Sequence, residues 1–170
     1  MAPEVYFSIG SNSGNAKRMA QRAIELIVAI SGASLIGRGG LYETEPQGKI
    51  DQPWFVNTAL AVRLEMEPEK VLEETRRIEA ELGRTPGERW GPREIDIDII
   101  FHDDTVMTTE ELTIPHPLAH MRRFVLAPLA DINPGLVHPV LGKTVIQLLD
   151  ALPEEGQTTR LIEPAPEEGP

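Results

Sequence analysis

Segments with strand-like and helix-like patterns alternate along the first part of the chain, and this order limits the folds that the chain can adopt. Short runs of apolar and β-branched residues predict strands, whereas apolar residues spaced three and four apart predict helices. A predicted helix over residues 15–31 begins at a potential cap, Asn15, and another over residues 68–83 ends at Gly83. The predicted strands are residues 5–10, 32–44 (interrupted by glycines), 54–66 and 94–101.

The order strand-helix-strand-strand-helix-strand over residues 5–101 is that of the split unit found in ferredoxin-like proteins. We therefore predict an α+β fold with a ferredoxin-like antiparallel sheet and helices packed on its faces. A short strand near Thr105–Met107 and two short helices, residues 122–132 and 144–152, are expected to follow this unit.

The end of the chain differs in composition from the rest. The 170 residues are enough for one well-buried domain, which we place at residues 1–152. Residues 153–170 contain five glutamates, four prolines and one arginine. Such a segment buries too little surface to offset its ordering entropy, so we predict a mostly disordered acidic tail.

Charge and residue usage exclude several classes of protein. Sixteen basic and 27 acidic residues give a formal net charge of −11, which argues against non-specific nucleic-acid binding. The absence of cysteine excludes disulfides and thiolate zinc sites. The first residues lack the features of a secretory signal, and no apolar run approaches the length of a membrane span. We expect a cytoplasmic monomer that binds small molecules, with no nucleic-acid or membrane partner.

Two aspartates interrupt an apolar strand in the sequence EIDIDI, residues 94–99. Because side chains alternate along a strand, Asp96 and Asp98 share one face, with Cα atoms roughly 6–7 Å apart. Carboxylates this close repel each other unless a cation lies between them, and magnesium is bound by one or two carboxylates plus substrate phosphates. The alternative is a solvent-exposed strand edge whose charges prevent aggregation.

An arginine- and glycine-rich segment, RTPGERWGPR (residues 84–93), lies directly upstream. Arginine binds phosphate oxygens bidentately, and glycine allows a loop to close over a phosphate donor. Clustered cations beside clustered acids favour a site that neutralises a polyphosphate together with a metal ion. The alternative is a solvated turn whose arginines balance an acidic protein. The sequence G-x-x-x-x-G-K-[ST] does not occur, which excludes a P-loop.

Two further groups of residues are candidates with a structural alternative. His116 lies between two prolines, and Arg122 and Arg123 begin a predicted helix whose N-terminus attracts anions. The alternative is a turn histidine beside surface charges. Phe55 and Asn57 share a strand face and could hold a flat heterocycle by stacking and hydrogen bonding. Phe55 could instead be a core residue.

Four stretches, in order between about residues 4 and 150, carry a family resemblance. They are FSIGSN, then YETEPQG with DQPWFVN, then GRTPGERWGPREIDIDII, and finally LTIPHPLAHMRRFVLAPLADINP. Together they resemble the 6-hydroxymethyl-7,8-dihydropterin pyrophosphokinases, and RWGPR followed by D-x-D is the most specific motif. The resemblance implies a ferredoxin-like fold and transfer of pyrophosphate from ATP to the hydroxymethyl group of dihydropterin in folate biosynthesis, with release of AMP.

The resemblance also implies roles for individual residues. Asp96 and Asp98 would hold two magnesium ions, and Arg84 and Arg93 would contact the ATP phosphates and act in catalysis. Trp90 would lie between the two substrates. The other implied ATP contacts are Ile99, Thr113, His116 and Arg122. The other implied pterin contacts are Gly10, Thr44, Pro46, Gln47, Phe55, Asn57 and Phe124, with the pterin ring between the two phenylalanines.

The chain departs from some relatives at two places. The segment Thr85-Pro86-Gly87 after Arg84 is one residue shorter, which affects how this loop closes, and Pro117 replaces an aromatic residue. Two other functions remain open on the residues alone. One is a different metal-dependent nucleotidyl or phosphoryl transferase. The other is a non-catalytic ferredoxin-like binding module, which would not need an acidic pair beside arginines.

Overall fold

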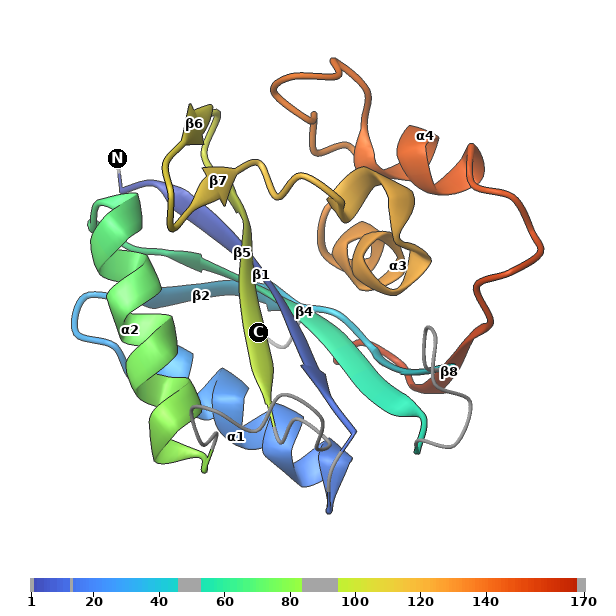
Figure 1. Cartoon of the computed structure of the whole chain (residues 1–170), viewed down its shortest axis with the longest axis horizontal. Helices are drawn as coiled ribbons and strands as arrows, with labels where there is room; N and C mark the ends of the chain where they lie inside the picture. Colours follow the sequence, from blue (N-terminus) through green and yellow to red (C-terminus); the bar gives the residue numbers. More distant parts are fainter. Residues whose placement is uncertain (1, 13, 46–52, 84–94, 168–170) are drawn as a thin grey trace.

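The computed structural model describes residues 2–12, 14–45, 53–83 and 95–167. The strands are β1 (Glu4–Ser11), β2 (Ser34–Arg38), β3 (Leu41–Thr44), β4 (Phe55–Arg63), β5 (Asp96–His102), β6 (Met107–Thr108), β7 (Thr113–Ile114) and β8 (Thr159–Glu163) (Figure 1). The helices are α1 (Ala16–Val28), α2 (Pro68–Glu81), α3 (Arg123–Ile132) and α4 (Val145–Asp150), with a 3-10 turn, η1, at Ala119–Met121.

One antiparallel sheet of order β5-β1-β4-β3-β8 forms the centre of the protein, and β2 also pairs with β4. β2 and β3 lie end to end along β4, because Ser34 pairs with Arg63 and Thr44 pairs with Phe55. With β2 and β3 counted as one interrupted strand, the sheet has the arrangement of the ferredoxin-like split unit. The predicted α+β fold is confirmed.

A glycine pair, Gly39 and Gly40, separates β2 from β3 where α3 packs closely against the sheet. A Cβ atom at Gly39 would lie 2.6 Å from the backbone oxygen of Pro128 in α3. Only glycine allows the two backbones to approach this closely. The glycine interruption in the predicted second strand therefore has a packing cause.

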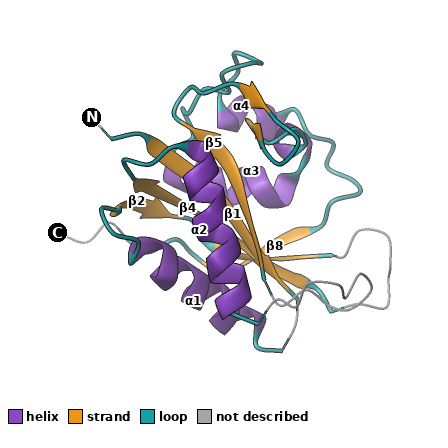
Figure 2. Ribbon diagram, turned by 60° about the vertical axis from the view of Figure 1, so that its left-hand side comes forward, coloured by secondary structure: helices purple, strands orange, loops and turns teal. Residues whose placement is uncertain are grey.

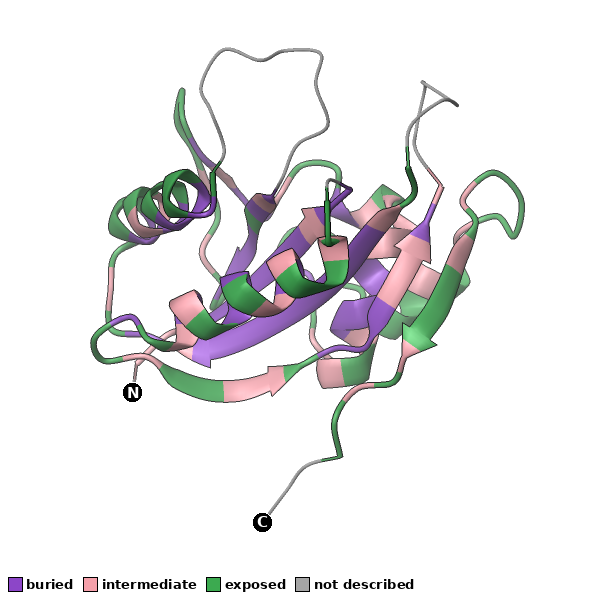
Figure 3. Ribbon diagram, turned by 90° about the horizontal axis from the view of Figure 1, so that it is seen from below, coloured by how far each residue is buried: buried purple, intermediate pink, exposed green. Residues whose placement is uncertain are grey.

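The helices cover both faces of the sheet, with α1 and α2 on one side and α3 and α4 on the other (Figure 2). Alternate residues of β1 serve the two faces: Val5, Phe7 and Ile9 pack under α1 and α2, whereas Tyr6 packs under α3 and α4. The central strands are buried, while the helices expose their outer sides (Figure 3). None of the helices in the described part of the chain is long and apolar enough to span a bilayer.

Several predicted boundaries are confirmed by their local chemistry. The Asn15 side chain accepts a hydrogen bond from the Arg18 backbone N–H at 3.1 Å and caps α1. Gly83, just beyond α2, has a φ of 98°, a conformation that favours glycine. The short strand expected near Thr105–Met107 is β6, slightly later in the chain, and it pairs with β7 in a separate two-stranded sheet.

The acidic tail is more ordered than its composition predicts, so the expectation of disorder is corrected for part of it. Residues Thr159–Glu163 form β8, which pairs antiparallel with β3 at the edge of the sheet. Leu161 and Ile162 of β8 remain 53% and 44% exposed, so burial of apolar surface is not what holds the strand. Backbone hydrogen bonds to β3 and the ion pair between Arg160 and Glu43 hold β8 in place. An argument from amino-acid composition takes neither contribution into account. The domain boundary at residue 152 remains a prediction.

Candidate active site

β5 places the acidic pair on the sheet face opposite α1 and α2. Its neighbours Ile97 and Ile99 are buried in the core under these helices, whereas Asp96 is half-buried and Asp98 is exposed. Across β1, Asp96 pairs with Gly10 and Asp98 pairs with Ser8. The predicted alternation is confirmed, and both carboxylates line one cavity.

This cavity has a volume of about 250 Å³, and we call it the smaller cavity because a second one, described below, is larger. Residues from five separate parts of the chain line it. It is lined by Ser8, Gly10, Thr44, Glu45, Phe55, Asn57, Asp96, Asp98, Arg122 and Phe124. Five of the residues predicted to bind pterin are therefore together: Gly10, Thr44, Phe55, Asn57 and Phe124. Arg122 also lines this cavity, with its guanidinium carbon 5.6 Å from the centre of the Phe124 ring.

The polar side chains of Asn57 and Thr44, which line the smaller cavity, hold each other in place. Asn57 is 4% exposed, and its Nδ2 donates a hydrogen bond to Thr44 Oγ1 at 2.7 Å. Gly10 lies opposite Asn57 in the β1–β4 ladder, and a Cβ atom there would come within 2.6 Å of Asn57 Oδ1. Glycine at this position therefore makes room for the Asn57 amide, which keeps a fixed orientation beside the cavity.

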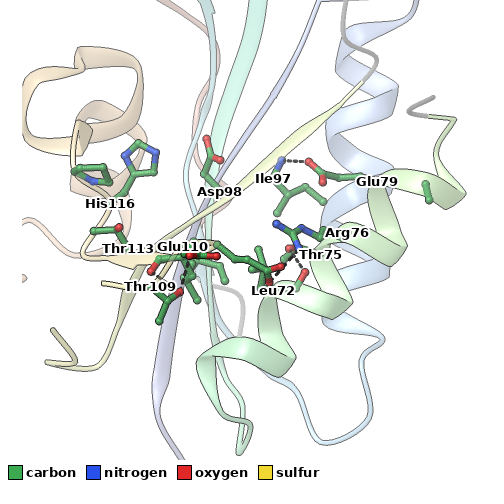
Figure 4. Close-up of a pocket in the computed structure, with 15 residues that line it drawn as sticks. Leu72, Thr75, Arg76, Glu79, Ile97, Asp98, Thr109, Glu110, Thr113 and His116 are labelled. Atoms are coloured by element: carbon green, nitrogen blue, oxygen red, sulfur yellow. Dashed lines mark hydrogen bonds and ion pairs between the residues drawn. The ribbon is translucent and has the colours of Figure 1, made fainter. Parts of the chain in front are cut away.

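A larger cavity, of about 670 Å³, lies between α2, the outer edge of β5 and the β6–β7 hairpin (Figure 4). Three of the residues predicted to bind ATP line it: Ile99, Thr113 and His116. Asp98 lines both cavities, so the two cavities share this carboxylate. A group bound to Asp98 would therefore be within reach of ligands in both.

His116 is held as a neutral hydrogen-bonding group. Its Nδ1 accepts a hydrogen bond from the Leu118 backbone N–H at 3.2 Å. Burial lowers the pKa of His116, the Asp98 carboxylate opposes this shift, and the positive charge of Arg122 adds to it. A neutral ring with Nδ1 as acceptor carries its proton on Nε2, which leaves one N–H donor for a ligand.

The carboxylates of Asp96 and Asp98 suit a magnesium ion that keeps part of its water shell better than a metal ion that is enclosed by protein ligands. Among the residues that the structure describes, no group of three or more histidine, aspartate or glutamate side chains is placed to hold a metal ion. Magnesium accepts one or two protein carboxylates and completes its shell with water and substrate phosphates. Asp96 and Asp98, facing an open cavity, fit that requirement.

Comparison with known proteins decides the family. The profile of 7,8-dihydro-6-hydroxymethylpterin-pyrophosphokinase (HPPK) matches residues 6–134. The chain belongs to this family. It is 41% identical over 151 residues to the 2-amino-4-hydroxy-6-hydroxymethyldihydropteridine pyrophosphokinase of Methylorubrum extorquens, covering 89% of this chain and 94% of that one. The family predicted from the motifs is confirmed, and the chain is a pyrophosphokinase of folate synthesis.

Other relatives of this pyrophosphokinase are much longer proteins. The folic acid synthesis protein fol1 of Schizosaccharomyces pombe is 40% identical over 151 residues, which are 89% of this chain but 21% of fol1. A crystal structure of Plasmodium falciparum HPPK-DHPS has the same fold, with a TM-score of 0.71 at 19% identity over 88% of this chain and 45% of that one. The present chain therefore corresponds to one part of those larger proteins.

The remaining predicted site residues of the pyrophosphokinase lie outside the residues that the structure describes. These are Pro46, Gln47, Arg84, Trp90 and Arg93. Their roles as pterin contacts, ATP contacts and catalytic arginines stay predictions.

Glu79 of α2 is a residue that the motifs did not single out. It is 8% exposed, and its Oε2 accepts a hydrogen bond from the Ile97 backbone N–H at 2.9 Å (Figure 4). Ile97 lies between Asp96 and Asp98 on an edge strand, so its outward N–H needs a partner from outside the sheet. Glu79 thereby fixes the backbone between the two carboxylates. The available signal was a charged residue on the buried face of a helix, next to Ile78.

We expect Glu79→Ala to lower the free energy of unfolding by about 1–3 kcal/mol, because the buried Ile97 N–H loses its acceptor. Catalytic activity should fall as well, since the acidic pair loses its anchor. Glu79→Gln keeps an acceptor oxygen and should lose less of both. Urea unfolding and steady-state rates measure these effects. The control is Glu81→Ala on the same helix, whose carboxylate is exposed in an ion pair with Arg77. A Glu79→Ala loss no larger than that of Glu81→Ala would contradict the anchoring role.

Proposed function

We propose that this pyrophosphokinase transfers the β,γ-pyrophosphate of ATP to the hydroxymethyl group of 6-hydroxymethyl-7,8-dihydropterin and releases AMP, and that it requires magnesium. The observation that carries the proposal is the position of Asp98, which lines both the smaller and the larger cavity beside Asp96. A phosphate chain placed between two substrates needs such a carboxylate pair at their junction.

The smaller cavity is the proposed pterin site. Its volume of about 250 Å³ suits a bicyclic heterocycle better than a nucleotide. Phe55 and Phe124 offer ring faces for stacking, and Asn57 offers an amide that can pair with the polar edge of the pterin. The proposed contacts Pro46, Gln47 and Trp90 would complete this site.

The larger cavity is the proposed ATP site. Its volume of about 670 Å³ can take a nucleoside with its phosphates, and Ile99 and Thr113 are among its lining residues. His116 is proposed to donate its Nε2–H to a phosphate oxygen, and Arg122 to contribute a positive charge nearby. Arg84 and Arg93 are proposed to neutralise the phosphate chain from the RTPGERWGPR segment.

Asp96 and Asp98 are proposed to hold two magnesium ions. Bound magnesium would screen the phosphate charges and lower the pKa of the attacking hydroxyl group. The hydroxyl group would then release its proton to solvent, and its oxygen would form a bond to the β-phosphorus while the bond from that phosphorus to the oxygen of AMP breaks. The isoleucines on the opposite face anchor β5 in the core and keep the geometry of the two carboxylates constant. We propose further that the enzyme acts as a cytoplasmic monomer on these small molecules alone.

The test of this function is AMP release from ATP, measured with and without hydroxymethyldihydropterin and with and without magnesium. We expect AMP and the pterin diphosphate to form in equal amounts, only when all three components are present. AMP formation that does not depend on the pterin would instead indicate a different phosphoryl or nucleotidyl transferase.

We expect Phe55→Ala and Phe124→Ala each to weaken pterin binding by about 1–3 kcal/mol, because each removes a stacking face. ATP affinity should change much less. Phe124 also packs against the core under α3 and α4, so Phe124→Ala should lower the melting temperature more than Phe55→Ala. Calorimetry with each ligand and thermal unfolding measure these effects.

The control for both variants is Ile146→Ala, which removes an exposed apolar side chain of α4 that lines neither cavity. An equal loss of affinity for the pterin and for ATP would show that the two rings act as structural core.

A further inference from the structure

We propose that the C-terminal segment Gln157–Glu163, here called the strap, positions three of the five wall segments of the smaller cavity and so sets the affinity for the pterin. The inference rests on the proposed function of that cavity. None of the strap residues lines the cavity. The strap acts through the wall segments that it holds, each of which carries two lining residues.

The first wall is the start of α3. Gln157 Oε1 accepts a hydrogen bond from the Arg123 backbone N–H at 2.7 Å, and Gln157 Nε2 donates one to the Met121 backbone oxygen at 2.9 Å. The helix lacks a cap of its own, because the Arg122 side chain at the N-cap position makes no capping hydrogen bond. Gln157 therefore holds the backbone on both sides of Arg122, and Arg122 and Phe124 line the cavity.

The second wall is the end of β3. Thr44 pairs with Thr159 in the β3–β8 ladder. Beyond it, the Glu45 backbone N–H donates to the Thr158 oxygen at 3.3 Å, and the Thr158 N–H donates to Glu45 Oε1 at 3.1 Å. Thr44 and Glu45 both line the cavity. The strap thus extends the strand pairing to the residues that form the cavity wall.

The third wall is the start of β4. The Arg160 guanidinium lies over the Trp54 ring, 4.6 Å from its centre, and forms an ion pair with Glu43 at 2.9 Å. Trp54 directly precedes Phe55, which lines the cavity together with Asn57. One arginine of the strap therefore ties the segment before Phe55 to β3.

These three contacts join wall segments that are far apart in the sequence. Without the strap, the start of α3 and the end of β3 would each lose a hydrogen-bonding partner. A stacking site needs its rings at a fixed separation, so looser walls lower pterin affinity before they lower the stability of the whole domain. The larger cavity has no lining residue in these wall segments. Among the described residues, Arg122, with its proposed charge near the ATP phosphates, is the one link from the first wall to the ATP site, so ATP affinity should change much less than pterin affinity.

The test compares Gln157→Ala with a control just before the strap, Glu155→Gln, in the full chain. Glu155 is exposed and lies outside the strap. Calorimetry gives the Kd of hydroxymethyldihydropterin in the presence of magnesium and a non-hydrolysable ATP analogue, and the Kd of that analogue alone. We expect Gln157→Ala to raise the pterin Kd about tenfold, from the loss of two hydrogen bonds, with little change for the analogue. The control should match the wild-type chain for both ligands.

Arg160→Ala provides a second variant that leaves Gln157 in place, and it should raise the pterin Kd selectively but less. The inference is overturned if both variants bind the pterin as the wild-type chain does, or if both ligands lose affinity equally. Those results leave the proposed function intact, because the wild-type chain would still bind the pterin. A wild-type chain that does not bind the pterin overturns the proposed function and this inference together.

Discussion

Asp98→Asn is expected to lower the rate of pyrophosphate transfer on the order of a thousandfold or more, and Asp96→Asn to have a similar effect. Metal ions supply several kcal/mol of transition-state stabilisation in phosphoryl transfer, and each 1.36 kcal/mol is about a factor of ten in rate. The amide keeps the shape of the side chain and removes the charge that holds a cation. The melting temperature should therefore change by only a few degrees. Single-turnover rates at saturating magnesium, with magnesium titrations by calorimetry, measure the effect.

The matched control is Asp104→Asn, an exposed carboxylate beyond the other end of β5 that lines neither cavity. This variant should keep the wild-type rate and magnesium affinity. If Asp96→Asn or Asp98→Asn keeps near-normal turnover at saturating magnesium, the assignment of the two metal ions to this pair is wrong. A lost rate combined with unchanged magnesium affinity would place the metal ions elsewhere in the chain.

Gly10→Ala is expected to weaken pterin binding by about 5- to 150-fold, which corresponds to the cost of about 1–3 kcal/mol for leaving a buried amide unsatisfied. The new Cβ atom would meet Asn57 Oδ1 at 2.6 Å. Asn57 cannot simply turn away, because it is buried and its Nδ2 is bound to Thr44 Oγ1 at 2.7 Å. The amide must therefore shift, and its alignment with the polar edge of the pterin is lost. Calorimetry with the pterin, beside thermal unfolding, separates this effect from a general loss of stability.

Gly135→Ala is the control for this prediction. The nearest atom to a Cβ at Gly135 is Asn133 Oδ1 at 3.8 Å, an ordinary contact, and the residue lies outside both cavities. It should leave affinity and stability close to those of the wild-type chain. Wild-type pterin affinity in Gly10→Ala would mean that Asn57 does not contact the pterin.

Local features of the sequence were enough to predict the elements of the ferredoxin-like unit and the acidic pair. The shared face of Asp96 and Asp98 follows from the period of a β-strand, and the start of α1 at Asn15 follows from a side-chain cap three residues from its donor. Both depend on residues that are close neighbours in the chain. The order of the elements then restricted the sheet to the ferredoxin-like arrangement.

Residue patterns alone left the roles of Phe55 and His116 open. A phenylalanine that stacks on a ligand and one that packs in the core have the same spacing in a strand, and a histidine between two prolines can be a ligand contact or a turn residue. The register of β1 against β4 decides that Gly10 lies beside Asn57, and the packing of α3 brings Phe124 into the same cavity as Phe55. The family resemblance pointed to these residues, but not to the contacts among them.

Tertiary structure alone decided two further features. Glu79 reaches Ile97 across 18 residues of sequence, and β8 pairs with β3 across more than a hundred, as in the pairing of Thr44 with Thr159. Backbone N–H and C=O groups are the same in every residue, so their pairing across the sheet leaves little trace in composition. The sequence by itself therefore determined the elements of the ferredoxin-like unit and which carboxylates share a face. Long-range contacts, both between backbones and from the side chains of Glu79 and Gln157, determined how the tail and the helices hold the site together.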